Sequence, residues 1–306
     1  MSSDNTNIWV FGSINTDMVV KANTLPHPGE TILGGEFFMN PGGKGANQAV
    51  AAARLGSSVT MVGCVGADAF GDQAIAGLNA ESINCRYIYQ DRSTASGVAL
   101  ISLDSKGENH IVVAPGANNS LSIQHVERAF NNIHDSALIM LQLEIPLDTV
   151  RHVLKLARRK NCRVILDPAP AREIPEMVLQ GLFLVTPNQS EAATLTGIKV
   201  DSNESASFAA QKLLEMGAEN VALTLGGEGA ILATPMGMEH IAVPSVAALD
   251  STAAGDCFNG ALASALAKGI SLKQAVRFGC RVASMAVTRL GAQDSMPREQ
   301  EVGRSA

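Results

Sequence analysis

The chain is poor in cysteine, in aromatic side chains and in clustered charge. It has five cysteines among 306 residues, and none of them forms a C-x-x-C pair. A disulfide framework or a structural zinc site is therefore not expected, and the cysteines favour a reducing, cytoplasmic setting. The six histidines show no spacing typical of a metal site.

Positive charge and long apolar runs are also scarce. The formal net charge is −6, the isoelectric point is near 5.5, and no run of Lys and Arg is longer than three residues, which argues against a nucleic-acid partner. No apolar run approaches the roughly 18 residues of a membrane span. Residues 1–7 are polar and lack the pattern of a signal peptide. We therefore expect no nucleic acid and no membrane among the partners.

What the chain does contain is a regular alternation of apolar strand-like and helix-like segments. A hydrophobic content of 46% suits one large α/β core. Alternating strands and helices predict a mostly parallel central sheet with helices on both faces. The predicted strands are 8–11, 59–65, 137–143, 163–166, 182–186 and 221–225, and the predicted helices are 46–55, 69–78, 147–159, 205–216, 256–267 and 272–289.

Two segments break this alternation. Residues 15–41 are rich in Pro and Gly, and residues 95–114 alternate apolar and polar around a predicted turn at 105–108. Both patterns are typical of a β-ribbon. We expect a single domain over 1–306 in which these two segments form a small β-ribbon lid.

The segment Asp250-Ser251-Thr252-Ala253-Ala254-Gly255-Asp256 is the most informative part of the chain. It is a turn of small residues that leads into a predicted helix, and the start of a helix attracts anions such as a phosphoryl group. Asp256 lies in the first helical turn, where a carboxylate can accept a proton from an attacking hydroxyl. The alternative is an ordinary helix start in which Asp256 complements the helix dipole.

Polar residues follow several predicted strands, at the edge where parallel α/β sheets bind ligands. Asn15 and Asp17 follow the first strand, and in an extended backbone they point the same way and can bind adjacent hydroxyls. An Asx turn would also explain either residue. The glycine-rich segment 41–48 adds Lys44 and Asn47 as donors, although it matches neither a Walker A loop nor a dinucleotide fingerprint.

Three further strand ends allow both a structural and a functional interpretation. Glu144 is either a sugar-binding acceptor or an ordinary loop acid. Asn188 and Glu191 have the spacing of a helix cap, and they also suit the ordering of magnesium and water around nucleotide phosphates. The segment 224–229 is either a hairpin turn or a glycine-rich wall beside a nucleotide.

Taken together, these segments resemble the ribokinase (PfkB) family of carbohydrate kinases. The match rests on residues 42–56 and on the 250–256 segment, and it extends over nearly the whole chain. Segments 12–17, 116–118, 167–172 and 288–293 add to it. The sequence departs from the family's Asp-Thr-x-Gly-Ala-Gly-Asp pattern at Ser251 and Ala253. It also has Cys280 where the family more often places His or Asn beside the adenine.

The resemblance implies roles for individual residues. Asp256 would be the catalytic base, and the amides of Ala253, Ala254 and Gly255 would form an anion hole. Sugar-binding positions would be Asn15, Asp17, Gly43, Lys44, Asn47, Glu144 and Asp256. Nucleotide-binding positions would be Asn188, Thr224, Gly226, Gly229, Gly255 and Cys280. Glu191 would handle Mg²⁺ indirectly, and a monovalent cation such as K⁺ would lie near Asp250, Thr252, Ala286, Arg289, Gly291 and Ser295.

The resemblance also implies a reaction, namely phosphorylation of the 5-hydroxyl of D-ribose by ATP to give D-ribose 5-phosphate. A kinase for 2-deoxyribose or another furanose is the alternative within the family, and a sugar-binding regulator without catalysis is the alternative outside it. The expected small molecules are the sugar, ATP, Mg²⁺ and K⁺. An exposed β-ribbon has an apolar face and an edge to cover, so we expect a homodimer formed through the lid.

Overall fold

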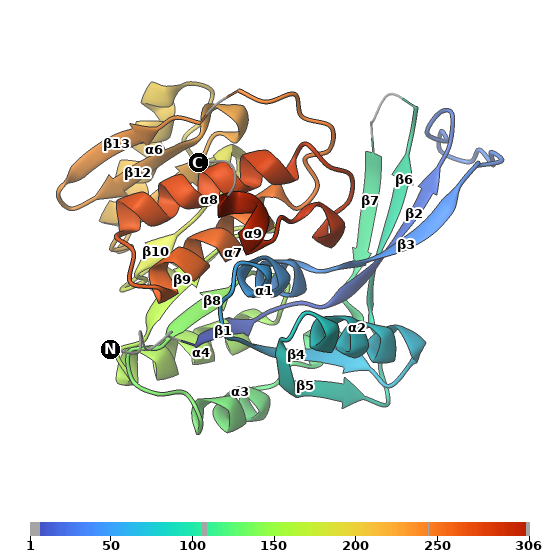
Figure 1. The fold of residues 1–306 in the computed structure, drawn as a ribbon, viewed down its shortest axis with the longest axis horizontal. Helices are drawn as coiled ribbons and strands as arrows, with labels where there is room; N and C mark the ends of the chain where they lie inside the picture. The colour runs from blue at the N-terminus through green and yellow to red at the C-terminus, as the bar shows by residue number, and fades with distance from the viewer. Residues whose placement is uncertain (1–6, 106–108, 244, 304–306) are drawn as a thin grey trace.

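The computed structural model describes residues 7–105, 109–243 and 245–303. Within these residues the large sheet has nine strands in the order β13-β12-β11-β10-β9-β8-β1-β4-β5 (Figure 1). Neighbours from β5 to β11 run parallel, and the edge β11-β12-β13 is antiparallel. The predicted α/β class is therefore confirmed. The strands are β1 (Ile8–Phe11), β4 (Val59–Gly66), β5 (Asn84–Asp91), β8 (Leu138–Leu141), β9 (Arg163–Leu166), β10 (Leu184–Val185), β11 (Val221–Thr224), β12 (Ala230–Thr234) and β13 (Gly237–Ile241).

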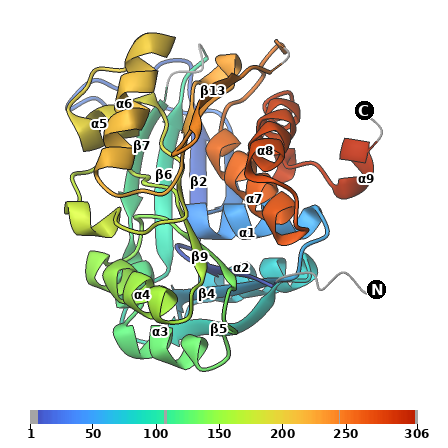
Figure 2. The same cartoon turned by 90° about the vertical axis from the view of Figure 1, so that its left-hand side faces the viewer.

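Helices cover both faces of this sheet, which lies between them in Figure 2. Successive side chains of a strand point to opposite faces, so Ile8 and Val10 enter one hydrophobic core and Trp9 and Phe11 enter the other. The first core includes α1 (Lys44–Arg54), α2 (Ala69–Ala80), α7 (Ala254–Ala267), α8 (Leu272–Ala286) and α9 (Glu299–Val302). The second includes α3 (Ile123–Phe130), α4 (Leu147–Arg159), α5 (Gln189–Thr196) and α6 (Asn203–Glu215). No helix within the described ranges combines the length and apolar character that a bilayer crossing requires.

A second, small sheet extends away from the main body (Figure 1). Four strands of the described chain form it in the order β3-β2-β6-β7, namely β2 (Asn15–Lys21), β3 (Phe37–Gly42), β6 (Gly97–Leu103) and β7 (Asn109–Ala114). The central pair β2–β6 is parallel and the two outer pairs are antiparallel. The turn predicted at 105–108 falls mostly on residues 106–108, which lie outside the described residues.

Several predicted elements begin or end at other residues than expected. The helix predicted over 46–55 starts earlier, at Lys44, because Gly43 has φ 88° and lets the chain turn directly into the helix. The helix predicted over 272–289 ends at Ala286. Beyond it, the N–H groups of Thr288 and Arg289 bond to carbonyls three residues back, which is a turn and not a continued helix.

The sequence interpretation missed β5, α3 and the hairpin β12–β13. Both edge strands, β5 and β13, carry polar side chains such as Arg86 and His240 and show no clear apolar alternation. Segment 224–229 connects the antiparallel strands β11 and β12, so its interpretation as a hairpin turn is confirmed.

The two helices that carry Lys44, Asn47 and Asp256, α1 and α7, pack closely. Gly260 in α7 lies against α1, and a Cβ at this position would come within 2.5 Å of Ala51 Cβ and 2.6 Å of the Gln48 carbonyl oxygen. Such distances are shorter than van der Waals contact, so only glycine permits this approach. The distance between α1 and α7 therefore depends on Gly260.

We predict that Gly260→Ala lowers the free energy of unfolding by about 1–3 kcal/mol, because the added methyl group forces the helices apart. Gly77→Ala is the matched control, since Gly77 also lies within a helix but a Cβ there meets no atom within 4 Å. That control should gain about 0.5–1 kcal/mol from helix propensity. Urea unfolding measures both, and an equal effect of the two changes would contradict this account of the packing.

Candidate active site

Helix α7 begins with an unusual backbone. Its N-cap is Ala253, which has φ 56° and ψ 18°. This left-handed region is uncommon for a residue with a Cβ, and such outliers cluster at functional sites. Ala254 donates its N–H to the Ser251 carbonyl at 3.2 Å. The following amides have no carbonyl to bond inside the helix, so this end presents donors and a positive dipole toward an anion.

Asp256 lies in the first turn of α7 and is buried, with 5% of its surface exposed. Its Oδ2 accepts a hydrogen bond from Asn47 Nδ2 at 2.9 Å, and its Oδ1 accepts one from Gln48 Nε2 at 3.1 Å. Burial raises the pKa of Asp256, while Lys44 and the two amides act in the opposite direction. The carboxylate is thus removed from water but supplied with donors.

A cavity of about 410 Å³ opens beside Asp256, between the large and the small sheet. The predicted catalytic and anion-hole residues line it, as do all the predicted sugar-binding residues. Those residues are Asn15, Asp17, Gly43, Lys44, Asn47, Glu144, Ala253, Ala254, Gly255 and Asp256. The structure therefore brings together groups that lie more than two hundred positions apart in the sequence.

Acidic side chains dominate this large cavity. Burial, together with the nearby Glu144 and Asp256, raises the pKa of Asp17 to about 6. Burial also raises the pKa of Asp167 to about 8. Lys44 is the cation among them: its burial lowers the pKa, but the surrounding carboxylates outweigh this and raise it above the usual value. The carboxylates of this cavity can accept hydrogen bonds from hydroxyl groups, and Lys44 can pair with an anionic group.

Hydrogen bonds hold the predicted sugar-binding residues in place. Asn118 Nδ2 donates to Asn15 Oδ1 at 2.7 Å, so Asn15 is oriented by a partner from a distant segment and not by an Asx turn. Glu144 Oε2 accepts from Ser13 Oγ at 2.5 Å and from the Lys44 N–H at 3.2 Å. These bonds join the end of β1 to the start of α1.

Asn188 and Glu191 form the capping box predicted from their spacing. Asn188 Oδ1 accepts from the Glu191 N–H, and the Glu191 carboxylate accepts from both the N–H and the Nδ2 of Asn188. Both side chains also line the large cavity. The structural and functional interpretations are therefore compatible, because the cap fixes a carboxylate at the wall of the cavity.

A second cavity, of about 250 Å³, adjoins the first at the start of α7. Both are lined by Thr224, Ser251, Ala254 and Gly255. Most of the second wall is apolar or glycine. The predicted nucleotide-binding residues Thr224, Gly226, Gly229, Gly255 and Cys280 all lie there, whereas Asn188 lies in the large cavity.

The positions expected around a monovalent cation lie in two segments, 250–252 and 286–295. Hydrogen bonds to the Asp250 carboxylate connect these segments. This carboxylate accepts from the N–H of Thr252 at 2.9 Å and from the N–H of Gly291 at 2.8 Å. The Ala286 carbonyl accepts from the Arg289 N–H. The Arg289 guanidinium pairs with the Glu301 carboxylate at 2.6 Å.

Ser295, the remaining predicted cation position, is buried and donates its Oγ to the Ala292 carbonyl at 2.8 Å. Across the described residues, His, Cys, Asp and Glu side chains form no group of three that could hold a metal ion.

Sequence reasoning missed several polar residues around Asp256. Gln48, Gln142, Asp167 and Gln293 are all buried and lie within the same hydrogen-bond network. Gln48 follows Asn47 in the glycine-rich segment, and Asp167 directly follows the strand β9, so their positions carried a signal. Gln293 ends the segment 288–293 that contributes to the family resemblance, whereas Gln142 follows no motif that points to the site.

Comparison with known proteins agrees with this geometry. The chain matches the profile of the pfkB family carbohydrate kinases over residues 5–299. It is 39% identical to a ribokinase of Haemophilus influenzae over 294 residues, which cover 96% of each chain. It is 36% identical to a deoxyribokinase of Salmonella typhi, with 95% of each chain covered.

A solved structure of Arabidopsis thaliana ribokinase, complexed with ribose and ATP, superimposes with a TM-score of 0.88 at 32% identity and covers 98% of each chain. Fold, cavity arrangement and sequence thus point the same way. The chain belongs to the pfkB family of carbohydrate kinases.

Proposed function

We propose that this protein transfers the γ-phosphoryl group of ATP to the 5-hydroxyl of D-ribose. The observation that carries the proposal is the position of Asp256, at the N-terminus of α7 where the two cavities meet. A sugar in the large cavity and a nucleotide in the adjoining one would place hydroxyl and phosphate on either side of this helix end. The relatives named ribokinase support the sugar and the nucleotide.

In the proposed reaction Asp256 accepts the proton of the 5-hydroxyl. The hydroxyl oxygen forms a bond to the γ-phosphorus, the bond from that phosphorus to the β–γ bridging oxygen breaks, and ADP leaves with the electron pair. The amides of Ala253 and Gly255 and the dipole of α7 stabilise negative charge on the phosphoryl oxygens, and Ala254 would join them on releasing the Ser251 carbonyl. Positioning and charge stabilisation supply most of the catalysis in such transfers.

The ring hydroxyls of ribose are assigned to Asn15, Asp17, Asn47 and Glu144, which line the large cavity as fixed acceptors and donors. Lys44 is assigned to the phosphoryl group or the developing charge, since it is the cation among these acids. A 2-deoxyribose kinase is the second candidate, because a relative named deoxyribokinase is nearly as similar as the ribokinases. A deoxy sugar would leave one buried polar group unpaired, which disfavours it.

Two cations complete the proposal. Mg²⁺ bound to the ATP phosphates would neutralise charge near Glu191 and Asp167, which line the large cavity. K⁺ would be held by carbonyls around 250–252 and 286–295, where Asp250 joins the two segments. This second cation would fix the loop that precedes the anion-binding amides. A cytoplasmic location stays a prediction, in keeping with the five free cysteines.

The small sheet is assigned two roles. One face carries Asn15 and Asp17 and borders the large cavity, so the sheet would close over the sugar and exclude water. The opposite face exposes a cross-strand row of Met39, Met18, Leu100 and Val112, of which Leu100 is 52% and Val112 is 66% exposed. An apolar row of this kind suits burial against a second copy of the chain, and we assign a homodimer to it.

ATP consumption with ribose, 2-deoxyribose and fructose tests the reaction. We expect the highest kcat/KM on ribose in the presence of Mg²⁺, and a higher rate in K⁺ than in tetramethylammonium. A higher kcat/KM on 2-deoxyribose would shift the proposal to the second candidate. Binding of ribose without turnover on any sugar would indicate a regulator.

Asp256→Asn is the control for the catalytic role within the same assay. The amide cannot accept the hydroxyl proton, so kcat should fall by about 10²–10⁴-fold, while the KM for ribose changes much less. Retained turnover would show that Asp256 is not the base.

Ribose binding should depend on the ionisation of Asp17. Because its pKa is raised to about 6, lowering the pH from 7.5 to 5 protonates it and removes a charged acceptor, so the KM for ribose should rise by about tenfold. Asp17→Asn should show a high KM with little pH dependence. An unchanged wild-type KM at pH 5 would contradict the assignment.

Asp17→Asn should also change the pH dependence of the free energy of unfolding. A raised pKa means that ionisation of Asp17 opposes folding as the pH rises from its unfolded value of 3.8 through about 6. Asp17→Asn should therefore gain up to about 3 kcal/mol in the free energy of unfolding at pH 8, and most of the gain should disappear at pH 4.

Light scattering tests the dimer. The double change Leu100→Asp and Val112→Asp should give a monomer, because two charges would be buried at the proposed interface. Phe208→Asp is the control, since Phe208 is 60% exposed on α6, away from the small sheet. A wild-type monomer at micromolar concentration would refute the interface.

A further inference from the structure

The carboxylate of Asp256 is held by two amide side chains, one on each oxygen. Asn47 donates to Oδ2 and Gln48 donates to Oδ1, at 2.9 and 3.1 Å. Asn47 and Gln48 are adjacent in α1 and are 5% and 1% exposed. Gln48 gives its Nε2 to Asp167 Oδ2 as well, at 2.8 Å. Helix α1 thus supplies the donors to both oxygens of the Asp256 carboxylate.

Each of these amides is oriented by another amide. Gln142 Nε2 donates to Gln48 Oε1 at 2.6 Å, and Gln293 Nε2 donates to Asn47 Oδ1 at 3.1 Å. An accepting oxygen on Gln48 and on Asn47 directs their NH₂ groups toward Asp256. Reversing either amide would bring its oxygen against a carboxylate oxygen and its NH₂ against another NH₂. We call Asn47, Gln48, Gln142 and Gln293 the amide network.

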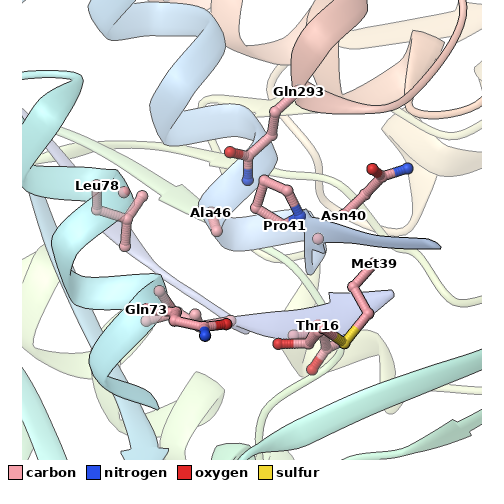
Figure 3. A pocket seen from close by; sticks show the side chains of 13 residues that line it. Thr16, Met39, Asn40, Pro41, Ala46, Gln73, Leu78 and Gln293 are labelled. Atoms are coloured by element: carbon pink, nitrogen blue, oxygen red, sulfur yellow. The ribbon is translucent and has the colours of Figure 1, made fainter. Parts of the chain in front are cut away.

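The two outer members come from separate parts of the chain and are fixed there. Gln142 follows β8, and Gly12 makes room for it, since a Cβ at Gly12 would collide with Gln142 Oε1. Gln293 begins a short 3₁₀ turn after α8, and its carbonyl accepts from the Arg54 guanidinium. Figure 3 shows Gln293 reaching toward α1 at the wall of a separate cavity of about 230 Å³.

We propose that Gln48, Gln142 and Gln293 are positioning residues that keep Asp256 in its ionised form and aim it at the sugar hydroxyl. The inference rests on the proposed role of Asp256 as the base. Donors to a carboxylate favour its charged form, and removing a donor favours the protonated form, which cannot accept the hydroxyl proton. Gln142 and Gln293 act through the two amides that touch Asp256.

Other charged groups near Asp256 act on it as well. Lys44 on α1 favours the carboxylate, while Asp17, Glu144, Asp167 and Glu191 surround it with negative charge from four other segments. With several acids and one lysine nearby, the local charge balance alone does not favour ionisation of a buried group. The amide network supplies the neutral donors that do so without adding another charge.

The test is the pH dependence of kcat/KM for ribose in Gln48→Met and Gln293→Met, in which methionine keeps the length of the side chain and removes the donor. Loss of a hydrogen bond to a charged group should move the acidic limb of the profile upward by about one pH unit in Gln48→Met. In Gln293→Met the shift should be smaller but in the same direction. The KM for ATP should stay within about twofold of wild type.

Gln73→Met is the matched control. Gln73 lies on α2 and lines the same cavity as Gln293 (Figure 3), but it is not a member of the amide network. Its pH profile and kcat should equal those of wild type. A merely structural role of the glutamines would lower the melting temperature without moving the acidic limb.

The outcomes separate this inference from the proposed function. Wild-type protein that turns over no ribose would overturn the function. Wild-type turnover with an unmoved acidic limb in both variants would overturn the network alone. If Gln48→Met fails to fold, which thermal unfolding detects, Gln293→Met decides the question, because it leaves both direct donors to Asp256 in place.

Discussion

The proposed reaction depends on keeping one buried carboxylate, that of Asp256, able to accept a proton. Asp256 lies away from water, and burial raises its pKa and so favours the protonated form. Helix α1 offsets this with Lys44 and two amides, which all lie within its first two turns. The close contact of α1 and α7 at Gly260 therefore matters for chemistry as well as for packing. A small change in the distance between these helices would lengthen both donors' hydrogen bonds.

The two sheets contribute different residues to the site. The large sheet and its helices hold Asp256, the anion-accepting helix end and the second cavity. The small sheet contributes Asn15 and Asp17 to the wall of the large cavity. Movement of the small sheet would thus change the contacts that Asn15 and Asp17 are proposed to make with a sugar, while Asp256 and its two amide donors lie on α7 and α1 of the main body. Asn47 links the two roles in the proposed reaction, because it lines the large cavity and also donates to Asp256.

Much of this arrangement was predictable because it is local or periodic. Apolar runs such as Ile8–Phe11 identified the strands, and parallel strands place Asn15, Glu144 and Asn188 at one edge. The amide network was not predictable, since Gln142 and Gln293 do not touch Asp256 themselves. They bond to Gln48 and Asn47 across the folded chain. The burial of Asp167, which sets its pKa, also depends on packing. The edge strands β5 and β13 lacked the apolar pattern that marks interior strands. The roles of the individual site residues stay predictions.

The position of β1 has a consequence for how the protein is made. Ile8 pairs on one side with Val59 and on the other with Leu138. During synthesis, one edge of this apolar strand has no partner until β8 has left the ribosome. The site closes later still, because Asp256 lies on α7 near the end of the chain. A chain interrupted before β8 would present an open, apolar strand edge of the kind that drives aggregation.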